Sequence, residues 1–368
     1  MIPIAKPCLN GNEKKYINEC IDTGWISSTG EFVKQFEILN SSFYGTKYAV
    51  AVSNGTVALH LALNALGIKE GDEVIIPDFT FAATANAVLY MKATPVLCDV
   101  DIDTWTIDVK KIEELITDKT KAIIPVHLYG QSCDMAEISR ISKKYNLYVI
   151  EDCAEAHGAE YEGSKVGSFG DISCFSFYGN KIITTGEGGI CLTNSSKLDT
   201  QMRILRDHGM SKTKRYWHDV VGYNYRMTNM QAAIGVAQME QIEDILRNRE
   251  HICELYDKYF EHSNRIQFRK RNELYKNVNW LYSLVFKNID SSRIEEIQNE
   301  LKQKGVDSRP LFYPLHKMSL YSEYKRSTLN NSIHIADFGL SLPTFNELKN
   351  SQIEYIAKTL LAILEKNK

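Results

Sequence analysis

Between Tyr48 and Ile150, short apolar runs alternate with segments of helical character. The apolar runs, which predict strands, span residues 48–52, 73–76, 95–100, 122–127 and 147–150. The segments between them, which predict helices, span residues 57–66, 80–91, 112–116 and 135–144. Strands that alternate with helices form a mainly parallel sheet with helices on both faces. The sequence therefore predicts an α/β fold with a large, doubly wound, mostly parallel sheet.

Ligands of such sheets bind beyond the carboxyl ends of the strands, so the residues that follow each strand are the first candidates for a site. Ser53-Asn54-Gly55-Thr56 follows the first strand and opens a helix. A glycine and the free N–H groups of a helix start suit an anion such as phosphate, although an ordinary helix cap explains the run equally well. Glu151-Asp152 closes the fifth strand, where a buried carboxylate needs a cationic partner. That partner belongs either to a structural ion pair or to a site.

Lys181 is the one charged residue between Asp171 and Glu187, in a stretch of aromatic, β-branched and glycine residues. Apolar surroundings lower the pKa of a lysine, and the neutral amine is a nucleophile. Taken alone, a surface lysine at the end of an apolar strand is the commoner case. The interpretation changes only when the residues at the strand ends are considered together with it.

Pyridoxal 5′-phosphate (PLP) needs a lysine that it can bind covalently, an acid opposite the pyridine nitrogen and a phosphate cup. Lys181, Asp152 and Gly55-Thr56 supply these three parts. The aspartate keeps the ring nitrogen protonated, and the lysine serves as general base and acid. The sequence does not support an NTPase phosphate-binding loop, because the chain has no Gly-x-x-x-x-Gly-Lys-Ser/Thr motif. It does not support a dinucleotide site either, because no Gly-x-Gly-x-x-Gly motif follows a strand.

The chain resembles the DegT/DnrJ/EryC1/StrS sugar-nucleotide aminotransferases, a family within fold-type I of the PLP enzymes (aspartate aminotransferase-like). The resemblance covers most of the chain in order, in SNGTVALHLAL (53–63), GDEVIIPDFTFAATANAV (71–88), VHLYGQ (126–131), EDCAEAHGA (151–159), VGSFGDISCFSFYGNKIITTGEGGI (166–190), RDHG (206–209), YNYRMTNMQAAIGVAQ (223–238) and SRPLFYPLH (308–316). Within the family, GNKIITTGEGG and KRYWHDVVGYNYRMTN (214–229) are most similar to the GDP-perosamine synthase-like 4-aminotransferases.

The resemblance implies a role for each matching residue. Lys181 and Asp152 are the catalytic residues, as the lysine that binds PLP and the partner of its ring nitrogen. The remaining cofactor contacts implied are Gly55, Thr56 and Ser176 at the phosphate, Phe81 on the ring face, Glu155 beside the ring hydroxyl, and Asn224, which reaches the phosphate from the other subunit of a homodimer. The position of Glu155 usually holds glutamine or histidine, so its charge leaves its role open. Tyr178, where phenylalanine is commoner, is likewise without an assigned role.

The matching loop at 308–316 lines the sugar-nucleotide site in the family, although its residues alone indicate a structured loop equally well. The resemblance implies substrate contacts for Arg309, Tyr313 and His316 in this loop, for Trp25 and Ser28 in the glycine- and hydroxyl-rich loop 23–30, and for Arg226. His208 is a further candidate, and a structural histidine is the equal alternative.

The activity implied is transfer of an amino group from L-glutamate to the C4 keto group of a nucleotide-linked 4-keto-6-deoxy sugar, with 2-oxoglutarate released and pyridoxamine 5′-phosphate (PMP) as the amine-bearing cofactor. GDP-4-keto-6-deoxymannose, giving GDP-perosamine, is the favoured substrate; a UDP- or dTDP-linked sugar, or attack at C3, is the alternative. A non-catalytic binding or regulatory protein is the remote alternative. Relatives with histidine in place of the lysine, or with an iron–sulfur cluster, act as dehydratases, and Lys181 and the lack of a cysteine cluster favour transamination.

The rest of the sequence indicates the domain organisation, the kinds of partner and the location of the protein. We expect a large PLP-binding domain with an N-terminal arm at 1–240 and a small α/β domain at 241–368, with one long helix from Met227 to Ile245 joining them. The net charge of −3 offers no basic stripe for nucleic acid, and Arg269-Lys270-Arg271 is expected to form a solvated face. The eight cysteines lack Cys-x-x-Cys spacing, so no zinc site or disulfide framework is indicated. Without a signal peptide or membrane span, a cytoplasmic protein is expected.

Overall fold

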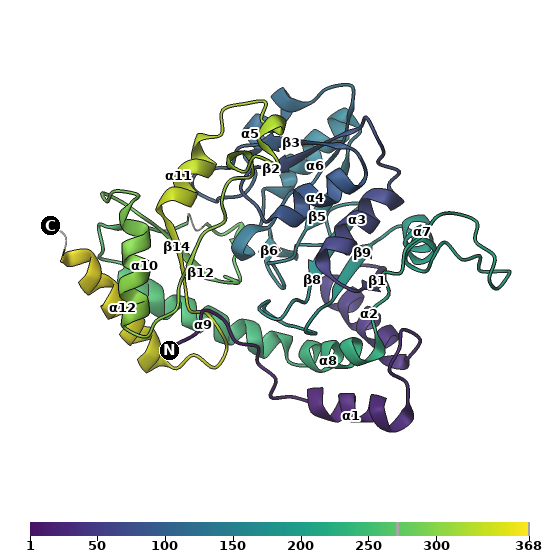
Figure 1. Cartoon of the computed structure of the whole chain (residues 1–368), viewed down its shortest axis with the longest axis horizontal. Helices are drawn as coiled ribbons and strands as arrows, with labels where there is room; N and C mark the ends of the chain where they lie inside the picture. Colours follow the sequence, from purple (N-terminus) through teal and green to yellow (C-terminus); the bar gives the residue numbers. More distant parts are fainter. Residues whose placement is uncertain (270–271, 367–368) are drawn as a thin grey trace.

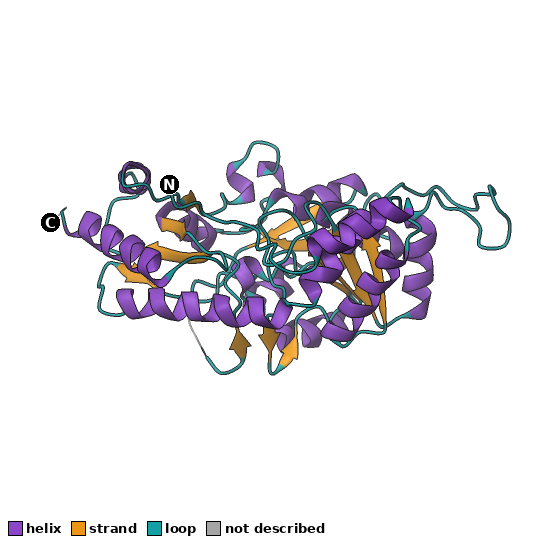
Figure 2. Ribbon diagram, turned by 90° about the horizontal axis from the view of Figure 1, so that it is seen from below, coloured by secondary structure: helices purple, strands orange, loops and turns teal. Residues whose placement is uncertain are grey.

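A computed structural model describes residues 1–269 and 272–366 of the chain. Most of the chain folds around two sheets, a large one built from the first half and a small one built from the last third (Figures 1 and 2). Among the described residues, no helix has both the length and the apolar character needed to cross a bilayer. Nor does a disulfide join any of the described cysteines.

The large sheet has seven strands in the order β1-β9-β8-β5-β4-β2-β3. They are β1 (Tyr48–Val52), β2 (Glu73–Pro77), β3 (Thr94–Cys98), β4 (Thr120–Ile123), β5 (Tyr148–Asp152), β8 (Ile172–Ser176) and β9 (Gly189–Thr193). Pairing is parallel from β8 to β3, whereas β9 runs antiparallel to both β1 and β8. Strand β1 therefore points the same way as β8, and every strand except β9 ends at one edge of the sheet. The predicted mostly parallel sheet is confirmed.

Both faces of this sheet are covered by helices, which explains why its strands are almost continuously apolar and buried. The helices of this part are α1 (Glu13–Thr23), α2 (Glu31–Tyr44), α3 (Gly55–Ala65), α4 (Ala82–Tyr90), α5 (Val109–Ile112), α6 (Met135–Tyr145), α7 (Ser196–Arg206) and α8 (Asn229–Met239), with 3₁₀ turns η1 (Glu113–Leu115) and η2 (Leu128–Gly130). On one face, the small side chains of α3 and α4 allow these two helices to pack closely on the sheet and on each other.

The small sheet has four strands in the order β10-β12-β14-β13. Its elements are β10 (Ile266–Gln267), β12 (Tyr282–Phe286), β13 (Arg309–Pro310) and β14 (Gly339–Leu342), with helices α9 (Ile242–Phe260), α10 (Arg293–Gln303), α11 (Asn330–Phe338) and α12 (Asn350–Glu365) and 3₁₀ turns η3 (Leu315–Lys317) and η4 (Ser322–Tyr324). Helices α9, α10 and α12 enclose a separate apolar core with this sheet. Gly305 follows α10 with a φ of +77°, the left-handed conformation expected of a residue that ends a helix.

Two segments cross between the predicted domains. At the N-terminus, Ile2 pairs with Val306 beside the small sheet, so the arm lies against the C-terminal part of the chain. In the other direction, Leu315 and Tyr321 enter the apolar core formed by α3, α4 and the large sheet. A third, three-stranded sheet joins β11 (Tyr275–Lys276) to β6 (Glu160–Tyr161) and β7 (Ser164–Lys165). The division into 1–240 and 241–368 stays a prediction.

Two expectations differ from the structure. The single helix expected from Met227 to Ile245 is two helices, because the chain leaves helical geometry at Gln241 (φ −113°, ψ 3°), and α8 packs on α1 and α2 while α9 packs on α12. The Arg269 side chain does not belong to a solvated face: it is buried, with its guanidinium 4.9 Å from the centre of the Trp105 ring. Lys270 and Arg271 lie outside the described residues.

Candidate active site

Three ionisable side chains meet beyond the carboxyl ends of β5 and β8. Asp152 is the last residue of β5, and Glu155 lies in the turn that follows it. Lys181 comes from the loop after β8, and its Nζ lies 3.4 Å from Glu155 Oε1. The structure thus brings together residues that the sequence places up to 29 positions apart, at the edge of the sheet where ligands of this architecture bind.

Asp152 is a buried carboxylate held by neutral donors. Its Oδ2 accepts a hydrogen bond from the Thr84 hydroxyl (2.8 Å), and its Oδ1 accepts one from the Ala154 N–H (3.2 Å). Burial raises the pKa of Asp152, and the bonds from Thr84 and Ala154 and the charge of Lys181 oppose that rise. A carboxylate in this position strongly favours a cation that enters the site, such as a protonated ring nitrogen.

Glu155 is fixed from both sides. Its Oε2 accepts a hydrogen bond from the Tyr129 N–H (2.8 Å), and its Oε1 faces Lys181. Burial raises the pKa of Glu155, while the positive charge of Lys181 lowers it. The charge that the sequence left without a role therefore has a partner in the structure, the amine of Lys181.

The turn after β1 forms a cradle with the end of β8. Asn54 caps α3 by accepting a hydrogen bond from the Val57 N–H (3.0 Å), so the helix starts at Gly55 as the sequence predicts. A Cβ at Gly55 would lie 2.8 Å from the Cβ of Ser176, so only glycine lets the helix start approach that serine. The first N–H groups of a helix have no carbonyl partner within the helix, and together with the Ser176 hydroxyl they suit a phosphate.

His157 supports this cradle and was missed in the sequence. Its Nε2 donates to the Ser176 carbonyl (2.8 Å), and its Nδ1 accepts from the Tyr44 hydroxyl (3.0 Å). Burial lowers the pKa of His157 to about 4, so the ring is neutral and its single proton sits on Nε2. The EDCAEAHGA match includes this histidine, but nothing in the sequence shows that Tyr44 and Ser176 flank it.

Three stacked aromatic side chains close the site over Lys181. The Trp280 ring lies 3.8 Å from Lys181 Nζ and donates its Nε1–H to the Asn180 carbonyl (2.7 Å). Tyr129 stacks on Trp280 (centroids 6.0 Å apart) and on Phe312 (5.2 Å). Nothing in the sequence singles out Trp280, and Tyr129 appears there only as part of the VHLYGQ match. Their contact with the site is visible only in the fold.

Glu151, the other member of the acidic pair, has a structural role. Its Oε1 accepts hydrogen bonds from the N–H groups of Phe169 (2.8 Å) and Gly170 (2.7 Å), and its Oε2 accepts one from Gly167 (2.8 Å). The buried His127 Nε2 lies 3.1 Å from the same Oε2. The two neighbouring acids therefore differ: Glu151 holds a loop behind the sheet, and Asp152 faces the site.

The predicted substrate contacts in the C-terminal loop fall into two groups. Tyr313 and Arg309 are exposed, and Tyr313 follows directly after the stacked Phe312. His316 is instead buried, and its Nδ1 donates to Asp78 Oδ2 (2.7 Å). Phe81, predicted to lie on the cofactor ring, is 59% exposed, with its ring 5.7 Å from that of Phe312.

The loop at 23–30 is attached to the start of α8. The side chain of Asn229 donates to the Trp25 carbonyl (2.7 Å), and the Asn229 N–H donates to the Ser27 carbonyl (2.7 Å). Trp25 projects into solvent and Ser28 is half-buried. Tyr178, beside the cradle, is half exposed.

Asn224 and Arg226 lie at the β1 edge of the large sheet, where Arg226 pairs with Val52. Arg226 forms an ion pair with Asp207 (2.8 Å), donates to Asn224 Oδ1 (3.0 Å) and lies 3.2 Å from His208 Nε2. His208 has a φ of +58°, a conformation that is rare for residues other than glycine. These residues form one polar cluster.

A family profile and individual relatives match the chain over nearly its whole length. The profile of the DegT/DnrJ/EryC1/StrS aminotransferase family matches residues 7–361. GDP-perosamine synthase of Escherichia coli O157:H7 is 46% identical, over 98% of this chain and 97% of that protein. GDP-perosamine synthase of Vibrio cholerae is 41% identical, over 98% of both chains. The family resemblance noted in the sequence is confirmed.

Solved structures of aminotransferases have the same fold as this chain. The aminotransferase PseC of Helicobacter pylori superimposes with a TM-score of 0.93 at 28% identity, over 99% of both chains. The putative sugar aminotransferase Spr1654 of Streptococcus pneumoniae, solved in a PLP form, also has a TM-score of 0.93 at 28% identity, over 99% of both chains. The predicted fold-type I architecture and the prediction of PLP as cofactor are confirmed.

Proposed function

Because this chain belongs to the DegT/DnrJ/EryC1/StrS aminotransferase family, we propose that it transfers the amino group of L-glutamate to C4 of GDP-4-keto-6-deoxymannose. The products are 2-oxoglutarate and GDP-perosamine. The observation that carries the proposal is the placement of Lys181 Nζ 3.4 Å from Glu155 at the sheet edge that Asp152 also faces. The similarity to GDP-perosamine synthases at 41–46% identity supports the GDP-linked 4-keto sugar.

The residues at this edge fit PLP. Asp152 would hold the ring nitrogen, Gly55, Thr56 and Ser176 the phosphate, and Lys181 the reactive carbonyl carbon. Phe81 would cover one face of the ring, and Glu155 would lie beside its hydroxyl. When bound, PLP supplies an electron sink and carries the amino group from one substrate to the other.

The side chains of the site then have separate tasks. The Lys181 amine would act as general base at Cα of glutamate and, once protonated, as general acid that returns a proton. Glu155 stabilises the Lys181 ammonium by charge, and the Trp280 ring face does the same from the other side. Burial of Asp152 and Glu155 excludes water, so each charge interaction is stronger than it would be in solvent.

We place Asn224 in a partner subunit's site, as part of a homodimer. The segment from Tyr216 to Val221 extends from the body of the molecule beyond α7 and exposes Trp217 and Val221 (Figure 1). Exposed apolar side chains on an extended segment are typical of an interface. Asn224 lies at the base of this segment, so a second copy that covers the segment would also lie close to Asn224.

We also propose a cytoplasmic location, which is consistent with cysteines that form no disulfides among the described residues.

Glutamate-dependent turnover on a panel of GDP-, UDP- and dTDP-4-keto-6-deoxy sugars tests the function, with the product identified by mass and NMR. We expect a 4-amino product from the GDP sugar, with kcat/KM at least tenfold above the UDP and dTDP sugars, and none from Lys181→Ala. Because both substrates use one site in turn, double-reciprocal plots should be parallel. A 3-amino product, or a preference for a UDP or dTDP sugar, would show that the proposed substrate is wrong and would identify another one. A cofactor-loaded protein that turns over no sugar would contradict the proposal.

A further inference from the structure

The segment from Phe312 to His316 begins in the aromatic stack over Lys181, and the Tyr313 side chain within it is exposed. It follows β13 and runs into η3, so it connects the small sheet to the large-sheet core. Leu315 and His316 are buried, whereas Tyr313 is 62% exposed. A tyrosine that projects from a segment buried on both sides of it is suited to contact a ligand.

The first anchor of this segment is Tyr129. Its hydroxyl accepts a hydrogen bond from the Phe312 N–H (3.0 Å), and its ring stacks on that of Phe312. Tyr129 itself is fixed, because its N–H donates to Glu155 and the residue holds a φ of +50°. A residue other than glycine in this conformation is kept there by its surroundings. One side chain therefore links Glu155, beside Lys181, to the backbone next to Tyr313.

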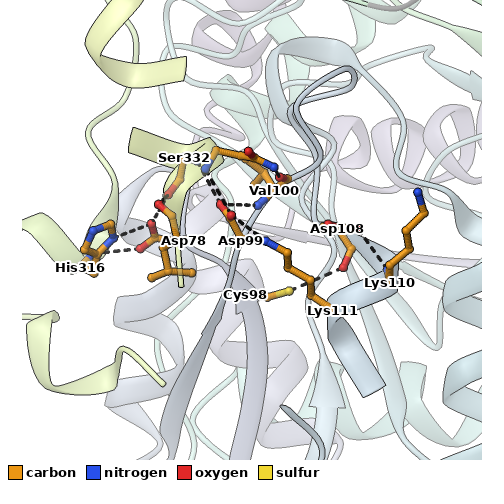
Figure 3. Close-up of polar contacts among 11 residues, drawn as sticks. Asp78, Cys98, Asp99, Val100, Asp108, Lys110, Lys111, His316 and Ser332 are labelled. Atoms are coloured by element: carbon orange, nitrogen blue, oxygen red, sulfur yellow. Dashed lines mark hydrogen bonds and ion pairs between the residues drawn. The ribbon is translucent and has the colours of Figure 1, made fainter. Parts of the chain in front are cut away.

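The second anchor is Asp78, which follows β2 and is fully buried. Its carbonyl accepts from the Leu315 N–H (2.8 Å), and its Oδ1 accepts from the His316 N–H (2.9 Å). Its Oδ2 accepts from His316 Nδ1 (2.7 Å) and from the Ser332 hydroxyl (2.6 Å), as Figure 3 shows. Side chain and backbone of one aspartate thus hold two successive residues of the segment.

We propose that Tyr129 and Asp78 are positioning residues that hold the segment 312–316 at both ends, so that Tyr313 is presented to the nucleotide sugar in a fixed place. The identity of the ligand rests on the proposed function; the anchoring rests on the contacts alone. Fixing a loop before the ligand binds removes the entropy cost of ordering it during binding. His316, predicted from the sequence as a substrate contact, acts here through Asp78 as part of the anchor.

Asp99 provides a matched control. It follows β3, the strand next to β2, and is as fully buried as Asp78. It accepts from the N–H groups of Asn331 (3.2 Å) and Ser332 (3.0 Å) and from Lys111 Nζ (2.9 Å). Figure 3 shows the contacts with Ser332 and Lys111. Asp99 therefore holds the start of α11 and none of these bonds goes to the segment 312–316. If replacing a buried aspartate merely damages the fold, Asp78→Asn and Asp99→Asn should have similar effects. If Asp78 anchors the segment, only Asp78→Asn should affect it.

The test compares Tyr129→Phe, Asp78→Asn and Asp99→Asn in the full-length holoenzyme. We expect Tyr129→Phe and Asp78→Asn to raise KM for the sugar nucleotide about tenfold, the loss expected for one or two hydrogen bonds. Tyr129→Phe keeps the ring stack and the N–H bond to Glu155 and loses only the hydroxyl, so the glutamate reaction, followed by the cofactor absorbance, should be slowed less than the sugar reaction. Asp99→Asn should leave KM for the sugar nucleotide unchanged.

Amide hydrogen exchange tests the anchors without any substrate. Exchange at Phe312 should accelerate in Tyr129→Phe, and exchange at His316 in Asp78→Asn, at least tenfold in each case, with neither changed in Asp99→Asn. Three results would overturn the inference. The first is that Asp99→Asn changes KM or amide exchange as much as Asp78→Asn does. The others are unchanged amide exchange in the anchor variants, and a glutamate reaction slowed as much as the sugar reaction in Tyr129→Phe. If the wild type accepts no nucleotide sugar, the ligand assignment fails with the proposed function, and the exchange pattern alone decides the anchors.

Discussion

The two halves of the site differ in how they are held. On the side proposed for the cofactor, Asp152 and Glu155 are each 4% exposed, and each accepts a hydrogen bond from the backbone. On the side proposed for the substrate, Trp25 and Tyr313 are 57% and 62% exposed. In the first half, the side chains themselves are held in place before any ligand arrives. In the second half, loops present exposed side chains whose own contacts come from the ligand or a partner, so changes in the two halves should affect different kinetic constants.

Asp152→Asn should give the largest effect among the changes that leave Lys181 in place. The amide removes the negative charge that we propose lies opposite the cofactor nitrogen, while Thr84 can still donate to the remaining oxygen. We expect kcat for both half-reactions to fall by roughly 10²–10³-fold, a loss typical of a preorganised electrostatic contact. Stopped-flow absorbance with glutamate alone measures it. A loss confined to KM for the sugar would place Asp152 in the substrate half and break the comparison.

His157 should make the stability of the cofactor half depend on pH. Its pKa is about 4 when folded, below the ordinary 6.5, so the unfolded chain binds the proton more readily. Its contribution is therefore complete above about pH 6.5 and is lost as the pH falls toward 4. Between pH 7 and pH 5 we expect a loss of about 2 kcal/mol in the free energy of unfolding.

Urea unfolding of the apoprotein at the two pH values measures this loss, with His157→Gln as control. The glutamine does not titrate in this range, so its stability should fall by about 2 kcal/mol less over the same interval. Equal losses in the wild type and the variant would show that His157 is not held neutral.

Glu155→Gln should sharpen the comparison by separating charge from shape. Glutamine still accepts the Tyr129 N–H but no longer pairs with the Lys181 ammonium, so we expect kcat to fall about tenfold. The acidic limb of the pH–rate profile should flatten, because protonation of Glu155 at low pH removes the same charge in the wild type. The glutamate reaction followed from pH 5 to pH 8 provides the profile. An unchanged limb would assign the titration to another group.

Tyr313→Phe should give the smallest effect. It removes one hydroxyl from an exposed side chain, and we expect KM for the sugar nucleotide to rise about threefold to tenfold with kcat unchanged. Initial rates at saturating glutamate measure both constants. A fall in kcat equal to that in Asp152→Asn would show that the two halves are not separable.

The same contrast explains what the sequence could predict. Parallel strands buried on both faces are continuous apolar runs, so β1 to β5 and the residues at their carboxyl ends were visible. Strand β9, which follows a glycine-rich turn, was not predicted, and periodicity could not show the break at Gln241. Lys181 and Asp152 stand out because their residue types are unusual where they occur.

Other parts of the site depend on contacts between distant segments. Trp280 reaches Lys181 from 99 positions away, and Asp78 binds His316 from 238 positions away. Nothing local marks these pairs, because each residue is ordinary within its own strand or loop. Arg269 shows the same limit from the opposite side: a charged run that reads as a surface places its first residue in the interior.

The most direct test of the account is the identity of the lysine that binds PLP. Borohydride reduction of the holoenzyme, digestion and mass spectrometry should find the cofactor on the peptide that contains Lys181, and on no other. Lys181→Ala should lack both the visible absorption band of the bound cofactor and any reduced adduct. A cofactor fixed to a different lysine, or a band and adduct that persist in Lys181→Ala, would contradict the assignment on which the site is built.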